Sequence, residues 1–178
     1  MEKKDYYKTI QDKIHSLKET YHSLKSKSDD YVFTILCVKA SFFKNPALDF
    51  GDEQINSFFV DSTKDGGVDA LFTDKNSETD NLIICQSKYY ETIKFDDVRN
   101  AVSKMISFYK SMEHGEYEIA NEKVQRRFLS LNAEVGEESK ICFVFYTSAL
   151  KNGIREDRIT KLLQEYGLDS NKFEIQLY

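Results

Sequence analysis

Apolar residues near the start of the chain recur with helical spacing. Between residues 5 and 24 they fall three or four positions apart and form one stripe of an amphipathic helix: Tyr6, Ile10, Ile14, Leu17, Tyr21 and Leu24. Residues 31–43 are apolar nearly all round and too many for a typical strand, so they predict a buried helix that closes at Asn45-Pro46. Residues 52–60 fit one more short helix, with an aspartate as its N-cap.

After residue 60 the pattern changes to that of strands. A glycine-rich corner, Asp65-Gly66-Gly67, leads into a mostly apolar run over residues 68–73. A polar turn over residues 74–81 separates this run from a second apolar run over residues 82–90. Two such runs around one polar turn predict a β-hairpin with a long tip.

The second half of the chain alternates between helical and strand patterns. Helical spacing occurs in three stretches: residues 95–112, 116–131 and 154–166, the last of which ends at Gly167 as a C′ cap. Residues 141–147 form an unbroken β-rich apolar run, typical of a strand covered on both faces, and residues 173–178 alternate as a final strand. This order predicts an α/β fold in which helices flank a central mixed β-sheet.

The length of the chain suits a single domain. A chain of 178 residues can bury one core, and this one contains no internal repeat, no low-complexity tract and one proline. We therefore expect one domain over residues 1–178, with N-terminal helices at 1–46 and a core at 52–178. Because the chain stops inside an expected core strand with no polar tail, we also expect it to be the N-terminal part of a longer protein.

Composition limits the partners and the location of the protein. The net charge of −5 argues against a broad basic field that holds nucleic acid, so any such contact must be local. The cysteines stand far apart in apolar stretches, without the spacing of a zinc site or a disulfide framework, which indicates buried thiols in a reducing cytosol: Cys37, Cys85 and Cys142. No apolar run approaches the roughly 20 residues that cross a bilayer, and no signal peptide is recognisable. We expect a cytoplasmic protein with no membrane partner.

Two clusters in the expected hairpin place polar groups inside apolar runs. They are Gly66-Gly67-Val68-Asp69-Ala70 and Cys85-Gln86-Ser87-Lys88-Tyr89. A buried charge costs free energy unless something compensates for it. Because side chains alternate along a strand, Gln86 and Lys88 project to one face, and the partner strand of the hairpin would bring Asp69 beside them.

An acid, an amide and an ammonium at one place suit metal-assisted hydrolysis of a phosphodiester. Asp69 would bind Mg²⁺ (or Mn²⁺), Gln86 would be a second metal ligand or position water, and Lys88 would orient the water or stabilise developing charge. The pair Gly66-Gly67 would let the backbone approach a phosphate closely. From the residues alone, an ordinary buried ion pair between Asp69 and Lys88 is an equally good interpretation.

The same residues resemble a known catalytic signature. Asp69, seventeen positions before Gln86-Ser87-Lys88, resembles the D…(D/E/Q)xK motif of the PD-(D/E)xK superfamily, in the Mrr-like variant whose middle acid is Gln. Residues 60–90 as a whole are similar to the N-terminal region of AIPR proteins, the abortive-infection phage-resistance family. The resemblance implies a restriction-endonuclease-like fold, catalytic Asp69, Gln86 and Lys88, and a metal-dependent endonuclease of bacterial phage defence that acts on DNA in preference to RNA.

The resemblance also implies a further acid and a particular assembly. Such families take another acid from a helix ahead of the Asp69 strand, and Glu53 and Asp52 are the candidates, although acids there also complement a helix dipole. Asp65 is a third candidate because it is close to Asp69 in sequence, although an aspartate before two glycines also forms turns. Since one site per chain cuts one strand, cleavage of duplex DNA would require a homodimer.

A calcium loop is a competing interpretation of residues 61–69. They match the first nine positions of an EF-hand loop, including the glycine at its sixth position, Gly66. The twelfth position is Phe72 where the loop needs a glutamate, and a strand pattern follows where an EF-hand has a helix. The calcium hypothesis also leaves Gln86 and Lys88 unexplained.

A catalytically inactive domain is the second functional hypothesis. Gln86 in place of an acid, together with an unassigned further ligand, would hold Mg²⁺ weakly. Such a domain would keep the fold and bind nucleic acid or a partner protein, because fold alone does not determine function. Metal-dependent DNA cleavage that Lys88→Ala abolishes would separate the two hypotheses.

Overall fold

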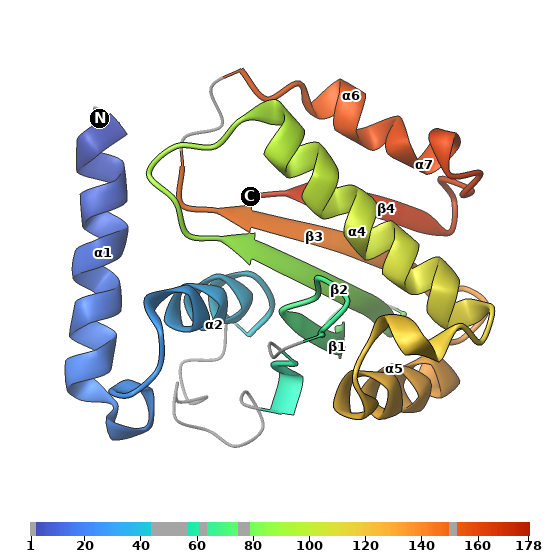
Figure 1. Cartoon of the computed structure of the whole chain (residues 1–178), viewed down its shortest axis with the longest axis horizontal. Coiled ribbons are helices and arrows are strands. Elements are labelled where there is room, and N and C mark those ends of the chain that lie inside the picture. The colour runs from blue at the N-terminus through green and yellow to red at the C-terminus, as the bar shows by residue number, and fades with distance from the viewer. Residues whose placement is uncertain (1–2, 44–56, 61–63, 75–78, 150–152) are drawn as a thin grey trace.

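The computed structural model describes residues 3–43, 57–60, 64–74, 79–149 and 153–178, and its centre is a four-stranded mixed sheet (Figure 1). The strands lie side by side in chain order: β1 (Ala70–Asp74), β2 (Asn81–Lys88), β3 (Ile141–Thr147) and β4 (Phe173–Leu177). β1 and β2 form the expected antiparallel hairpin, while β3 runs parallel to β2 and β4 parallel to β3. The predicted strands and the mixed sheet are confirmed.

Alternation along β2 divides the core into two layers. Leu82 and Ile84 pack on one side, here called the α4 face, against four helices: α4 (Phe95–Glu113), α5 (Glu122–Glu134), α6 (Glu156–Thr160) and α7 (Leu162–Glu165). Ile83 and Cys85 pack on the other side, the α2 face, against α1 (Lys3–Thr20) and α2 (Asp29–Phe42). Figure 1 shows α4 and α2 on opposite sides of the strands. The sheet is flanked by helices, as the sequence predicts.

The N-terminal helices differ from the prediction in their ends. α1 stops at Thr20 because Tyr21 is extended, with φ −111° and ψ 108°, and the 3-10 turn η1 (His22–Leu24) follows. Leu24 is nevertheless buried, which explains why the apolar spacing suggested one continuous helix. α2 begins after Ser28, whose Oγ accepts a hydrogen bond from Tyr31 N at 3.2 Å. The predicted closure at Asn45-Pro46 lies outside the described residues.

Two predicted helices in the second half are interrupted. The stretch 116–131 opens with the 3-10 turn η2 (Tyr117–Ile119), and α5 begins only at Glu122. The stretch 154–166 contains α6 and α7 in place of one helix. Gly167 closes α7 with φ 69°, and Leu168 N donates to Leu163 O at 2.7 Å, so the predicted glycine cap is confirmed.

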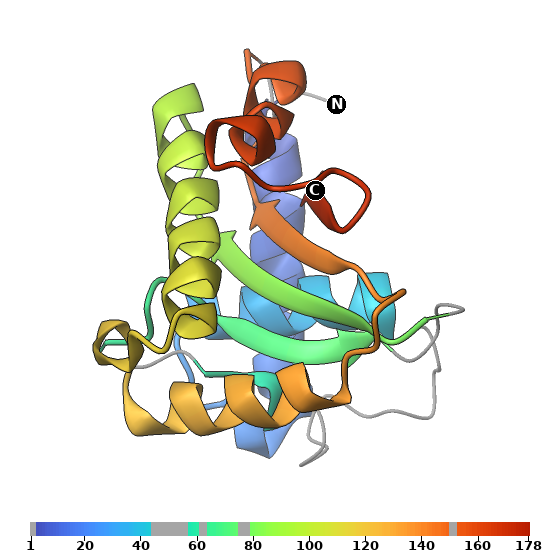
Figure 2. The same cartoon turned by 90° about the vertical axis from the view of Figure 1, so that its right-hand side faces the viewer.

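The edge strand β1 is covered by two neighbours. Of the predicted helix 52–60, only residues 57–60 are described, and Phe59 there forms an antiparallel bridge to Ala70. α5 lies alongside the same strand (Figure 2), and Arg127 Nε donates to Leu71 O at 3.2 Å. These contacts satisfy backbone groups that an edge strand would otherwise expose.

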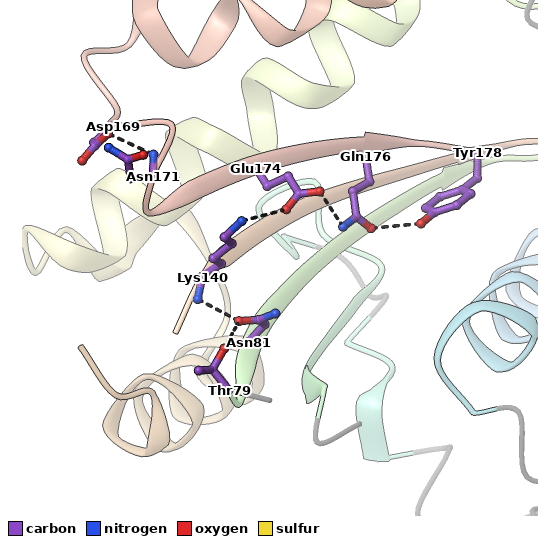
Figure 3. A network of polar contacts seen from close by, with 8 residues as sticks. All are labelled: Thr79, Asn81, Lys140, Asp169, Asn171, Glu174, Gln176 and Tyr178. Carbon is purple, nitrogen blue, oxygen red and sulfur yellow. Dashed lines mark hydrogen bonds and ion pairs between the residues drawn. The ribbon is translucent and has the colours of Figure 1, made fainter. Parts of the chain in front are cut away.

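The opposite edge strand, β4, has one apolar and one polar side. Its residues Phe173, Ile175 and Leu177 join the core of the α4 face. Glu174 and Gln176, which alternate with them, form a polar row with Lys140 and Tyr178 (Figure 3). Lys140 Nζ lies 3.7 Å from Glu174 Oε2, Gln176 Nε2 donates to Glu174 Oε1, and Tyr178 OH donates to Gln176 Oε1. Within the part of the chain described, no helix is long and apolar enough to cross a membrane.

Candidate active site

The loop before β1 is held in a tight conformation. Gly66 and Gly67 both have positive φ, 73° and 78°, a backbone conformation that residues with a Cβ rarely adopt. Asp65 Oδ1 accepts a hydrogen bond from Gly67 N at 2.7 Å, so Asp65 acts as a turn former. The carbonyl of Lys64 accepts from both the backbone N, at 2.8 Å, and Nδ2, at 3.2 Å, of Asn121. The loop is thereby attached to the start of α5.

Asp69 leaves this loop and lies against the end of β2. Regular pairing of the hairpin stops at Ala70 with Cys85, and Asp69 N still donates to Cys85 O at 2.8 Å. Its carboxylate then takes the place of a strand carbonyl, because Oδ2 accepts from Ser87 N at 2.6 Å. The same oxygen also accepts from Ser87 Oγ at 3.2 Å. The structure therefore places the Asp69 carboxylate in contact with Ser87, the residue between Gln86 and Lys88.

Gln86 is a buried amide on the α4 face. Its side chain is 5% exposed, and its Oε1 has no hydrogen-bond partner among the described residues. A Cβ placed on Gly67 would lie 3.8 Å from Gln86 Nε2 and 3.4 Å from Lys104 Cβ, so the glycine loop and α4 border this amide. A buried acceptor without a partner costs about 1–3 kcal/mol, so its position calls for a bound water, ion or ligand.

Lys88 follows two positions later on the same strand face. It lies at the end of β2 and is partly exposed, so the interpretation as a fully buried ion pair with Asp69 loses its premise. Strand alternation directs Lys88 and Gln86 to one side of the sheet, toward the α4 face. An ammonium in this position is accessible to a ligand that approaches the end of the hairpin.

The described residues supply few acids for a metal. Glu53 and Asp52 lie outside them, and Asp65 is bonded to the backbone of its own turn. Within the described ranges no group of three or more His, Cys, Asp or Glu side chains is placed to hold a metal ion. The motif itself offers two oxygen-bearing side chains, Asp69 just before β1 and Gln86 in β2. Mg²⁺ keeps several waters, so it is the ion that would need the fewest ligands from the protein.

The calcium-loop hypothesis is wrong. Phe72, at the twelfth position, is fully buried in β1 and pairs with Ile83 across the hairpin. A strand therefore stands where an EF-hand needs a glutamate and a helix. The carboxylate of Asp65 faces its own backbone, which is the ordinary role of aspartate in a turn.

Two hydroxyl groups at the site were not expected from the motif. Ser87 is 7% exposed and Thr34, in α2, is 3% exposed, and their Oγ atoms lie 2.6 Å apart. The available sequence signal was weak: Thr34 is the single hydroxyl residue in the middle of the apolar run 31–40, and Ser87 occupies the variable position of the motif. Buried polar residues in apolar runs need partners.

Comparison with known proteins does not assign the chain to a family. No protein-family model, no curated protein and no solved structure matches it. The similarity to AIPR proteins therefore stays a prediction from the motif. The functional argument rests on the geometry around Asp69 and Gln86.

Proposed function

We propose that this chain is a metal-dependent endonuclease domain of the PD-(D/E)xK type, with a restriction-endonuclease-like fold. The observation that carries the proposal is the buried Gln86 Oε1, which has no partner among the described residues. Gln86 directly precedes Ser87, the residue of β2 to which Asp69 is hydrogen-bonded. A hydrophobic residue would cost less at Gln86 if the position were only structural. An oxygen kept there in spite of that cost indicates a ligand for it.

Each residue has a separate role in the proposed hydrolysis. Asp69 and Gln86 would hold Mg²⁺ or Mn²⁺, which when bound supplies Lewis-acid activation of the scissile phosphate and of water. Lys88 would donate N–H groups to the phosphate oxygens or to the attacking water. Gly66 and Gly67 provide the tight turn that leads into Asp69, and the side chains of Phe108 and Lys104 pack close beside them.

The biological setting belongs to the same proposal. Following the AIPR resemblance, we assign the domain to abortive-infection defence against phage in the bacterial cytoplasm, with DNA as the preferred substrate. Cleavage of both strands would then need two copies of the chain. Glu53 and Asp52 are the proposed sources of a further acid.

A catalytically inactive binding domain is the second candidate. The observation that favours it is the supply of acids: among the described residues, no three metal-binding side chains gather at the site. Two oxygen ligands, one of them neutral, hold Mg²⁺ weakly. Lys104, beside the glycine loop, and Lys88, at the end of β2, could then hold a phosphate of nucleic acid without cutting it.

A cleavage assay tests the proposal directly. Purified protein is incubated with plasmid DNA, single-stranded DNA and RNA in Mg²⁺, Mn²⁺ or EDTA, and compared with Asp69→Asn and Lys88→Ala. We expect cutting that EDTA abolishes and that either substitution lowers at least 100-fold, on the order of a lost metal ligand or charge-stabilising donor. Lys13→Ala, an exposed lysine of α1, is the matched control and should cut like the unaltered protein.

The assay also separates the two candidates. Folding of each variant is checked by circular dichroism, so that loss of cutting reports on chemistry. Retention of DNA in a gel shift, without cutting in any metal, would support the binding domain and overturn the nuclease. Cutting by Asp69→Asn and Lys88→Ala at the unaltered rate would show that the activity comes from another site.

A further inference from the structure

Asp69 is joined to the N-terminal helix layer by a continuous row of polar contacts. Thr34 Oγ1 lies 2.6 Å from Ser87 Oγ, which lies 3.2 Å from Asp69 Oδ2. Ser87 N also donates to Asp69 Oδ2, at the short distance of 2.6 Å. These contacts cross from α2, through β2, to the carboxylate in front of β1.

The number of donors limits where the two hydroxyl hydrogens can point. Each hydroxyl has one hydrogen, and Thr34 Oγ1 also lies 2.9 Å from the carbonyl of Asp30. The charged carboxylate is the stronger acceptor for Ser87, so Ser87 donates to Asp69. The single hydrogen of Thr34 then lies between two acceptors, the Asp30 carbonyl and Ser87 Oγ.

Burial explains why this chain of hydroxyls exists. Thr34 and Ser87 are both more than nine-tenths buried between α2 and the sheet, where an unpaired hydroxyl costs free energy. Valine would fill the Thr34 position with nearly the same shape and no polar group. The hydroxyl of Thr34 contacts both the Asp30 carbonyl and Ser87, so Thr34 is the residue through which α2 reaches the hydroxyl beside Asp69.

We propose that Ser87 and Thr34 are positioning residues that fix the Asp69 carboxylate for metal binding. The proposal rests on the proposed function, because it assigns Asp69 as the metal ligand. Ser87 supplies two donors to one carboxylate oxygen, which sets the rotation of that group. Thr34 fixes the hydroxyl of Ser87, so α2 becomes part of the support of the site. Groups that orient metal ligands typically change metal affinity 10–100-fold when lost.

The test compares two pairs of variants by Mn²⁺ binding in the absence of nucleic acid. Mn²⁺ affinity is measured by electron paramagnetic resonance for Thr34→Val, Thr34→Ser, Ser87→Ala and Asp69→Asn. Thr34→Val should weaken binding roughly 10-fold, Ser87→Ala should weaken it as much or more, and Thr34→Ser should restore it. Thr73→Val, which removes another buried hydroxyl from the sheet, is the matched control and should bind like the unaltered protein.

A second readout does not depend on metal. The amide proton of Ser87, observed by nuclear magnetic resonance, should move in Asp69→Asn and in Thr34→Val but not in Thr73→Val. If Thr34→Val binds Mn²⁺ like the unaltered protein while Asp69→Asn loses it, the positioning role is overturned and the nuclease proposal stands. If the unaltered protein binds no Mn²⁺, the proposed function is overturned. An unmoved Ser87 amide in Thr34→Val would overturn the hydroxyl chain by itself.

Discussion

Gly66 is a residue whose replacement separates two physical effects. Its φ of 73° disfavours any side chain, and a Cβ there would lie 2.6 Å from Phe108 Cδ2. Gly115 has almost the same φ, 77°, but a Cβ there would meet no atom within 4 Å. Both Gly66→Ala and Gly115→Ala should therefore introduce backbone strain. Only Gly66→Ala should also introduce a steric clash, with Phe108.

We expect Gly115→Ala to lower the free energy of unfolding by about 1 kcal/mol, the cost of the left-handed backbone conformation. Gly66→Ala should lower it by a further 1–3 kcal/mol, roughly, because Phe108 is fully buried and has little room to move. Urea unfolding of both variants measures the two values. Equal losses would mean that the ring of Phe108 moves aside at no cost.

Roles of single residues could be predicted where strand geometry alone decides them. Gln86 and Lys88 are two apart on one strand, so their common face follows from alternation. The bond from Ser87 to Asp69 could not be predicted, because it depends on the hairpin pairing ending at Ala70. The contact with Thr34 depends on how α2 packs on the sheet, which no local pattern contains.

At the scale of elements, Asn121 connects helix α5 with the loop of the site. Its Oδ1 accepts from Val124 N at 3.1 Å, as the N-cap of the helix, and its Nδ2 donates to Lys64 O. Asn121→Ala removes both side-chain contacts. Asn121→Asp keeps the acceptor for the cap and removes the donor to the loop.

We expect Asn121→Ala to lower the free energy of unfolding by about 1 kcal/mol, the usual value of an N-cap. Asn121→Asp should lose less than half of that, because aspartate caps helices as well as asparagine does. Both variants should speed hydrogen exchange at Gly67 N, which depends on the order of the loop. Unchanged exchange in both variants would show that the backbone N of Asn121 is sufficient to hold the loop.

Elements were predictable where apolar runs begin and end at clear polar breaks. The seven residues of β3 are all buried, and the run in the sequence has the same length. The breaks at Tyr21 and Lys161 were missed, because Leu24 and Leu162 continue the helical spacing of apolar residues across them. Tertiary burial keeps the pattern continuous while the backbone changes conformation.

At the scale of the whole molecule, the fold class and the helix layers on the two faces of the sheet can be predicted from the sequence more readily than the candidate site can. Two strands joined by one polar turn favour a hairpin, and strands separated by helices favour parallel neighbours. The candidate site brings together residues of the hairpin, of α2 and of the loop attached to α5. Such a meeting of distant segments depends on packing across both layers of the core.

Burial of the cysteines has a consequence for the stability of the whole molecule in alkali. Burial raises the pKa of the half-buried Cys37 and of the buried Cys142 from 9.0 to about 12. Burial also raises the pKa of Cys85 well above 9.0, with the charge of Asp69 as a second cause. In the unfolded chain these thiols ionise near their ordinary values, so between pH 9 and 12 the unfolded state binds fewer protons than the folded state.

The contribution of the thiols to stability should therefore be constant below about pH 8 and fall as pH rises through 9 and beyond, since linkage costs up to about 1.4 kcal/mol per thiol per pH unit. Three thiols acting together would remove about 4 kcal/mol by pH 10, a large part of an ordinary domain stability of 5–15 kcal/mol. Urea unfolding at pH 7, 8, 9 and 10 measures the slope. In Cys37→Ala, which deletes one of the three groups, the loss of stability between pH 9 and 10 should be smaller by about 1 kcal/mol. A slope that this substitution leaves unchanged would mean that the thiol of Cys37 reaches solvent in the folded protein.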